Sequence, residues 1–165
     1  MNKIFLIFAL LSFWSCRNPE ETENIKKEES LSSFVLKNYK GSKLSWRLIA
    51  KKAKISDTIS IYGLEVEFFE INSGISSILK ADSGFIFNNN KDLKVMGNVV
   101  ITSSDSMKLW TDELNWSEDR QKIFTDSEIK YSKGKETYKG KGLEADPDLK
   151  KIIIKEKFTG EGEFK

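Results

Sequence analysis

A strand-like unit recurs between Leu79 and Phe164, and this recurrence is the strongest constraint on the fold. Each copy carries a small residue followed by aspartate, beside apolar residues that alternate with polar ones. The four marks are Ala81-Asp82, Thr111-Asp112, Thr125-Asp126 and Ala145-Asp146. Alternation at a period of two places one set of side chains on one face of a strand. The sequence therefore predicts a stack of β-strands with one shared apolar face.

The region from Phe34 onward is almost entirely strand-like. A change of phase near Tyr62-Gly63 predicts a bulge that switches which residues face inward. No stretch of ten or more residues in this region has helical periodicity. Many short strands at regular spacing are typical of an all-β sandwich, barrel or jelly roll. We expect the inward side to form an unsealed apolar trough.

The aspartates of the four marks are interpreted as turn residues at strand ends. An aspartate at such a position accepts backbone N–H bonds and stabilises the register. Asp112-Glu113 is thus expected to separate one short strand around Thr111 from another around Leu114. The alternative is that the aspartates are metal ligands or acids, but they recur once per strand pair, as structural residues do.

The composition excludes most enzyme chemistry. The 27 basic and 25 acidic residues are interspersed, which argues against a nucleic-acid partner. Histidine is absent and Cys16 is the only cysteine, so the usual zinc sites, histidine-dependent nucleophiles and an internal disulfide are excluded. We expect no enzyme activity, cofactor or metal. A carbohydrate hydrolase with two carboxylates stays open as an alternative, although the spacing singles out no pair.

The amino terminus has the pattern of an export signal. Residues 4–14 are apolar apart from Ser12, a run shorter than the roughly 20 residues that span a bilayer. Cys16 follows a small residue, as in bacterial lipoproteins, so residues 1–16 are interpreted as a lipoprotein signal peptide with Cys16 as the lipid anchor. A plain signal peptide is the alternative. Residues 17–33 are polar and predict a flexible tether, and residues 34–165 form the predicted domain.

Four segments of the domain resemble the LptC family in order and spacing: residues 41–50, 93–101, 109–114 and 142–146. That family is the membrane-anchored periplasmic component of the lipopolysaccharide export ABC transporter, within an LptA/OstA-like superfamily. The resemblance covers about residues 36–164. It implies a twisted, open β-jelly roll of stacked antiparallel strands.

The resemblance also implies a function and its partners. The module would receive lipopolysaccharide from the inner-membrane ABC transporter complex and pass it to an LptA-like periplasmic bridge protein. It would lie in the periplasm at the inner membrane. This chain departs from the best-known members in its anchor, because they keep a transmembrane helix, whereas here the lipidated Cys16 would hold the protein on the membrane. The expected lipopolysaccharide groove consists of Leu44, Trp46, Leu48, Leu64, Val66, Phe68, Phe85, Phe87, Val95, Val99, Ile101, Leu114, Trp116, Phe124 and Ile129. The expected partner contacts are Phe34, Leu36, Gly134, Ile152, Ile154 and Phe158.

A second function class stays open from the sequence. The chain could be a structural or adhesive lipoprotein displayed on the cell surface, with the β-domain used only to bind another protein. The two classes differ in whether the apolar face shelters a lipid. No GxxxxGK[ST] phosphate loop is present, so any energy for transport must come from another protein.

Overall fold

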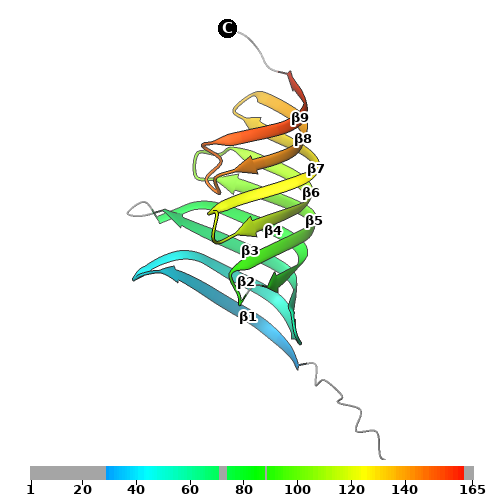
Figure 1. The fold of residues 1–165 in the computed structure, drawn as a ribbon. Helices are drawn as coiled ribbons and strands as arrows, with labels where there is room; N and C mark the ends of the chain where they lie inside the picture. The colour runs from blue at the N-terminus through cyan, green and yellow to red at the C-terminus, as the bar shows by residue number, and fades with distance from the viewer. Residues whose placement is uncertain (1–28, 71–73, 88, 162–165) are drawn as a thin grey trace, which may run out of the picture.

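One antiparallel sheet forms the whole of the part that the structure describes. The computed structural model describes residues 29–70, 74–87 and 89–161, and in these residues the structure is all-β, which confirms the predicted fold class (Figure 1). The strands are β1 (Glu29–Lys40), β2 (Lys43–Ile55), β3 (Ile59–Glu70), β4 (Gly74–Phe87), β5 (Asp92–Ser103), β6 (Lys108–Ser117), β7 (Lys122–Lys133), β8 (Glu136–Ala145) and β9 (Ile152–Glu161). Each strand pairs with the next along the chain, in the order β1 to β9, as an open β-jelly roll does.

Most of the strands bend in the middle, so that the sheet folds over on itself (Figure 1). The hydrogen-bonded register shifts between Lys80 and Ser83, between Met96 and Val99, and at corresponding points in other pairs. At these shifts one strand of the pair has an extra residue, a β-bulge, which increases the bend. The β2–β3 and β3–β4 pairs bend along the same line without a shift in register at the bend. The bends form a line of corners between two facing layers. Layer A contains Trp46 and Ile101, and layer B contains Ile86 and Leu114.

Three of the four aspartate marks lie at these corners, which corrects the prediction that they end strands. Asp82, Asp112 and Asp126 are inside β4, β6 and β7, whereas Asp146 does follow the end of β8. The register of β6 against β7 shifts just after Thr111, so β6 is one bent strand and not two short ones. A bend and a turn both interrupt the alternation, which is why the pattern did not separate them. The predicted phase change at Gly63 is confirmed, since Ile61 and Leu64 both face inward.

Side-chain hydrogen bonds stabilise the corners. Asn98 Nδ2 donates to Asp82 Oδ2 at 2.7 Å, across the β4–β5 corner. Gly97 has a φ of +78°, and a Cβ there would lie 2.7 Å from the same carboxylate oxygen. The Thr111 hydroxyl donates to the carbonyl oxygen of Glu128 at 2.9 Å. These contacts explain why a small residue or glycine and a short acceptor recur at the bends.

The core lies between the two layers. Its largest fully buried side chains are Trp46, Leu48, Ile61, Val66, Leu79, Ile86, Ile101, Leu109, Leu114, Ile123, Leu143 and Leu149. The rings of Phe68 in layer A and Trp116 in layer B are 5.1 Å apart, which shows that the layers face each other. Burying each aliphatic side chain contributes about 1.5–3 kcal/mol. The sheet is open, as expected, but side chains fill its middle where an unfilled trough was predicted.

β1 begins before the predicted domain boundary at Phe34. Its first residues, from Glu29 to Ser32, pair with the end of β2, for example Leu31 with Ala53. This segment is polar, and it gains a strand conformation because β2 supplies the hydrogen-bonding partner. The part of the predicted tether before Glu29, and Cys16, lie outside the described residues.

A glycine in β4 allows close packing of β4 on β5, and its replacement tests this. A Cβ on Gly84 would lie 2.6 Å from the Lys94 carbonyl oxygen and 3.2 Å from Val95 Cγ1. Because the nearest atom is backbone, Gly84→Ala must push the two strands apart. We expect a loss of about 2–3 kcal/mol in the free energy of unfolding, measured by urea denaturation. Ser60→Ala, at an outward-facing position of β3 opposite Phe85, is the control and should cost less than about 1 kcal/mol.

Candidate functional site

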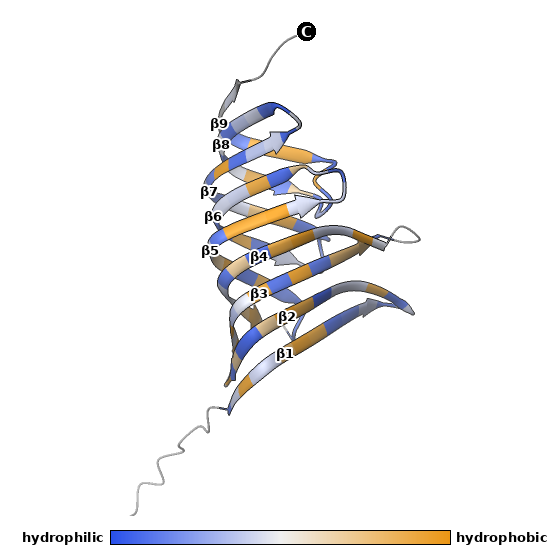
Figure 2. Ribbon diagram, turned by 180° about the vertical axis from the view of Figure 1, so that it is seen from behind, coloured by the Kyte–Doolittle hydropathy of each residue, from blue (hydrophilic) through white to orange (hydrophobic). Residues whose placement is uncertain are grey.

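An apolar strip on the inner side of the folded sheet is the candidate site. Most of the predicted groove residues face this interior, and alternating hydropathy along the strands marks them (Figure 2). The ones that the structure places inside are Leu44, which is half-buried, and Trp46, Leu48, Leu64, Val66, Phe68, Val95, Val99, Ile101, Leu114, Trp116 and Ile129, which are buried. They come from strands β2 to β7, so the strip crosses most of the stack.

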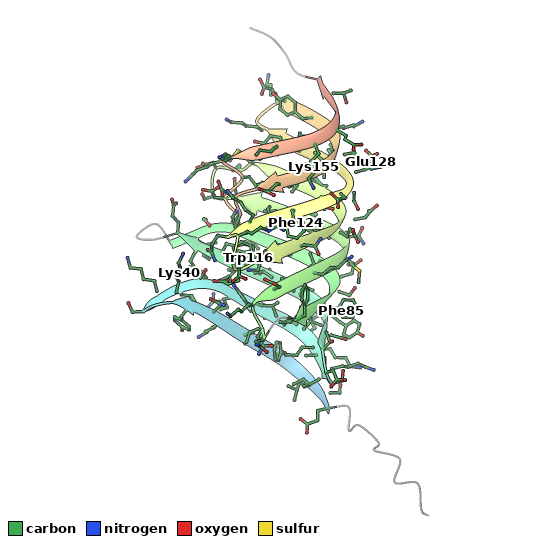
Figure 3. The ribbon with its side chains drawn as sticks, in the orientation of Figure 1. Lys40, Phe85, Trp116, Phe124, Glu128 and Lys155 are labelled. Atoms are coloured by element: carbon green, nitrogen blue, oxygen red, sulfur yellow. The ribbon has the colours of Figure 1, made fainter. Side chains whose placement is uncertain are left out.

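Three predicted groove residues lie on the outer face instead. Phe85 and Phe87 are 39% and 44% exposed, and Figure 3 shows Phe85 projecting outward. The bend in β4 shifts the alternation, so Gly84 and Ile86 face inward in their place. Phe124 is also outside, because its neighbour Ile123 is fully buried. The Arg120 guanidinium lies 4.0 Å from the centre of the Phe124 ring, a cation–π contact.

Several interior residues were not among the predicted groove residues. They are Ala53, Ile61, Leu79, Ile86, Leu93, Leu109, Ile123, Tyr131, Leu143 and Leu149. Most of them follow the same alternation once it is counted separately on each side of a bend, which is the signal that could have found them. Leu149 belongs to the loop between β8 and β9 and has no periodic signal at all.

Both ends of the strip are partly open. Phe34 and Leu36 of β1 and Ile152 and Ile154 of β9 are half-buried against the core. β1 and β9 are the edge strands, and each has a neighbour in this sheet on one side only. The predicted contact residue Gly134 lies in the exposed β7–β8 turn, and a Cβ there would meet nothing within 4 Å. The side chain of Phe158 is outside the part of the chain that can be described.

Opposite the corners, the ends of the two layers meet along a seam. We define the seam by Trp46, Phe68 and Glu70 of layer A with Trp116, Glu118 and Lys150 of the layer B side. Trp46 Nε1 donates to Glu118 Oε2 at 3.0 Å, and Lys150 Nζ lies 3.4 Å from Glu70 Oε2. Among the described residues, no backbone pairing between strands joins the two layers here; side chains hold them together.

Charged side chains lie mainly on the outer faces. Lys80 pairs with Glu65 at 3.0 Å and Lys94 with Glu113 at 2.9 Å, between neighbouring strands. Lys155 donates to Asp126 at 2.7 Å and thereby lowers the pKa of that exposed carboxyl group. Figure 3 shows Lys155 on the outside of the upper strands. Such exposed pairs help set the register and add little stability.

The interior contains few polar groups. The buried polar side chains among the described residues are Glu67, Ser76, Ser77, Ser103, Thr111 and Thr125. Glu67 is paired with Arg47, and this hydrogen bond raises the pKa of the Arg47 side chain. In the same part of the chain, no group of three potential metal-ligating side chains comes together. The interior is therefore lined almost wholly by apolar side chains.

Comparison with known families identifies the chain. A protein-family model described as "Lipopolysaccharide-assembly, LptC-related" matches residues 5–163, which is nearly the whole sequence. The chain belongs to the LptC-related family. No curated protein matches the sequence in a direct search.

Membership of the LptC-related family confirms the resemblance found in the sequence. The LptC-related chain therefore has a role in lipopolysaccharide transport, and its family is a transport family and not an enzyme family. The family is periplasmic and associated with the inner membrane. Within the described residues of this LptC-related chain, no helix is long and apolar enough to cross a membrane.

Proposed function

We propose that the chain is a lipid-binding transfer module that receives lipopolysaccharide from the inner-membrane ABC transporter and passes it to an LptA-like bridge protein. One observation carries this proposal. The apolar interior runs from one edge strand to the other, with half-buried apolar residues at both ends. A lipid that crosses an aqueous compartment needs such a shelter, because each sheltered methylene is worth about 0.8 kcal/mol.

The way the two layers are joined supports a role in sheltering a ligand. The layers are continuous through the corners, but at the seam only side-chain contacts hold them. The ion pair of Lys150 with Glu70 at the seam is half-exposed and therefore weak. An acyl chain can replace apolar side-chain contacts of the filled core with contacts of its own, so spreading the layers costs less when lipid is present.

The edge strands support the proposed partners. An unpaired edge can add a strand from another protein and thereby extend the sheet. We assign β1, with Phe34 and Leu36, to the transporter, and β9, with Ile152 and Ile154, to the bridge protein. An acylated Cys16 would keep β1 near the inner membrane, since more than one acyl chain gives stable anchoring. With both edges occupied, the apolar strip would continue from one protein to the next.

Photo-crosslinking at an interior position tests the proposed function. Val99 is buried and faces the interior, whereas its neighbour Val100 faces the outer side of β5. We expect p-benzoylphenylalanine at position 99 to give a lipopolysaccharide adduct in living cells, detected by gel shift and immunoblotting. The same residue at position 100 should give little or no adduct. Equal yields at the two positions, or no adduct at position 99 and at other interior positions, would contradict the proposal.

A further inference from the structure

The loop between β8 and β9 inserts a leucine into the core at the seam. Leu149 is only 1% exposed, although it belongs to a loop. Its φ is +61°, a conformation that is unfavourable for a leucine. The burial of its side chain must offset this strain. Leu149 therefore fills space in the interior without being part of the sheet.

The loop is tied mainly to itself. The Leu149 N–H donates to the Asp146 carbonyl oxygen at 2.9 Å, and the Lys150 N–H donates to Asp148 Oδ1 at 3.0 Å. Its contact with layer A is the ion pair of Lys150 with Glu70, which is half-exposed. Asp146 is also paired with Lys122, at the start of β7. The loop thus holds much of its own shape, and Leu149 is the part of it that is buried in the core.

A buried hydrogen-bond donor without a partner lies at the same seam. Trp116, labelled in Figure 3, is 4% exposed. Its Nε1 has no acceptor among the described residues. Trp46 differs, since its Nε1 donates to Glu118. A buried N–H without a partner is unfavourable and is rare in folded proteins. A ligand with an acceptor oxygen would satisfy it.

A hollow of about 220 Å³ adjoins these residues. Phe68, Phe69, Trp116 and Pro147 form its apolar part, and its polar part consists of Ser45, Glu70, Ser76, Gln121, Asp146 and Asp148. The apolar part suits a hydrocarbon, and the free donor suits one carbonyl group. This combination is that of the ester or amide end of an acyl chain.

We propose that the seam is an acyl-chain binding site in which Trp116 Nε1 donates to the carbonyl oxygen of the chain and Leu149 acts as a displaceable plug. This inference rests on the proposed function and assigns part of it to named residues. Lipid would reach the interior from the side, through the seam, as well as from the ends of the stack. When the β8–β9 loop moves away from the seam, Leu149 would leave the core and the hydrocarbon would fill the space that it occupied.

Photo-crosslinking at Phe69 tests the site in the full chain in living cells. Phe69 lines the hollow, and Phe124 is the matched control because it is an equally half-buried phenylalanine on the outer face. With p-benzoylphenylalanine at each position, we expect a lipopolysaccharide adduct at position 69 and none at position 124. An adduct at position 99 without one at position 69 would overturn the seam site alone. Absence of adducts at both 69 and 99 would overturn the proposed function as well.

Two substitutions test the role of Trp116 as donor and the role of Leu149 as plug separately. Trp116→Phe keeps an aromatic ring but removes the N–H, so the adduct yield at position 69 should fall about fivefold while the amount of folded protein stays the same. Leu149→Gly removes the plug and relieves the strained φ, so that yield should rise. With protein abundance unchanged, an unaltered yield in Trp116→Phe would overturn the donor, and an unaltered or lower yield in Leu149→Gly would overturn the plug.

Discussion

Depletion of the protein should leave newly made lipopolysaccharide at the inner membrane. The proposed module shelters the acyl chains between the transporter and the bridge protein, and without it each exposed methylene costs about 0.8 kcal/mol in water. The lipid would therefore remain in the bilayer where it is made. Pulse labelling followed by separation of the two membranes measures this directly.

The same experiment distinguishes the transfer module from a surface adhesin. Expression of the intact chain during depletion should restore lipopolysaccharide to the outer membrane. A chain with Ser60→Ala, at an outward-facing position of β3, should restore it equally well. If depletion left the distribution of lipopolysaccharide unchanged, the transfer role would be wrong and a structural or adhesive role would be favoured.

Ile101→Asp should unfold most of the domain at neutral pH. Ile101 has no exposed surface and lies in the middle of the apolar strip. The substitution removes about 2–5 kcal/mol of packing and buries a carboxyl group without a partner, which costs several kcal/mol more. Their sum is comparable to the total stability of a typical domain, about 5–15 kcal/mol. Circular dichroism during thermal unfolding measures the loss.

The pH dependence of the stability of Ile101→Asp shows whether the buried carboxyl group causes the destabilisation. Burial raises the pKa of the new carboxyl group in the folded state, so the folded state binds the proton more tightly than the unfolded state does. The destabilisation therefore grows as the pH rises above about 4, the pKa of an unfolded aspartate, and the variant should be more stable near pH 4 than near pH 7. Thr102→Asp, on the outward side of the same strand, should cost less than about 1 kcal/mol. Equal losses at the two positions would show that Ile101 is not in the interior of the folded protein.

Local patterning was sufficient to predict the strands, and it failed where a strand bends. Leu79 and Ala81 face inward, and continuing their alternation places Phe85 and Phe87 inward as well. The bend at Asp82 shifts the alternation by one residue and reverses this assignment. A bend and a turn use the same small and acceptor-bearing residues, so the sequence pattern could not distinguish a corner inside a strand from its end.

The seam could not be predicted from the sequence. Trp46 and Glu118, which form a hydrogen bond across it, are 72 positions apart in the chain. No alternation connects them, because they are brought together only when the sheet folds over on itself. Leu149 is a similar case, since one leucine in a polar loop has no local signal that distinguishes burial from exposure.

The amino-acid sequence by itself determined the all-β class, the stacked strands and the absence of histidine chemistry, because these depend on composition and on a period of two along each strand. It also carried the family pattern that identifies the chain. Only the tertiary structure decided which aromatic residues face inward, where the strands bend and how the two layers close at the seam. Those features depend on contacts between residues distant in the chain, and the free energy of such contacts is decided by packing in three dimensions.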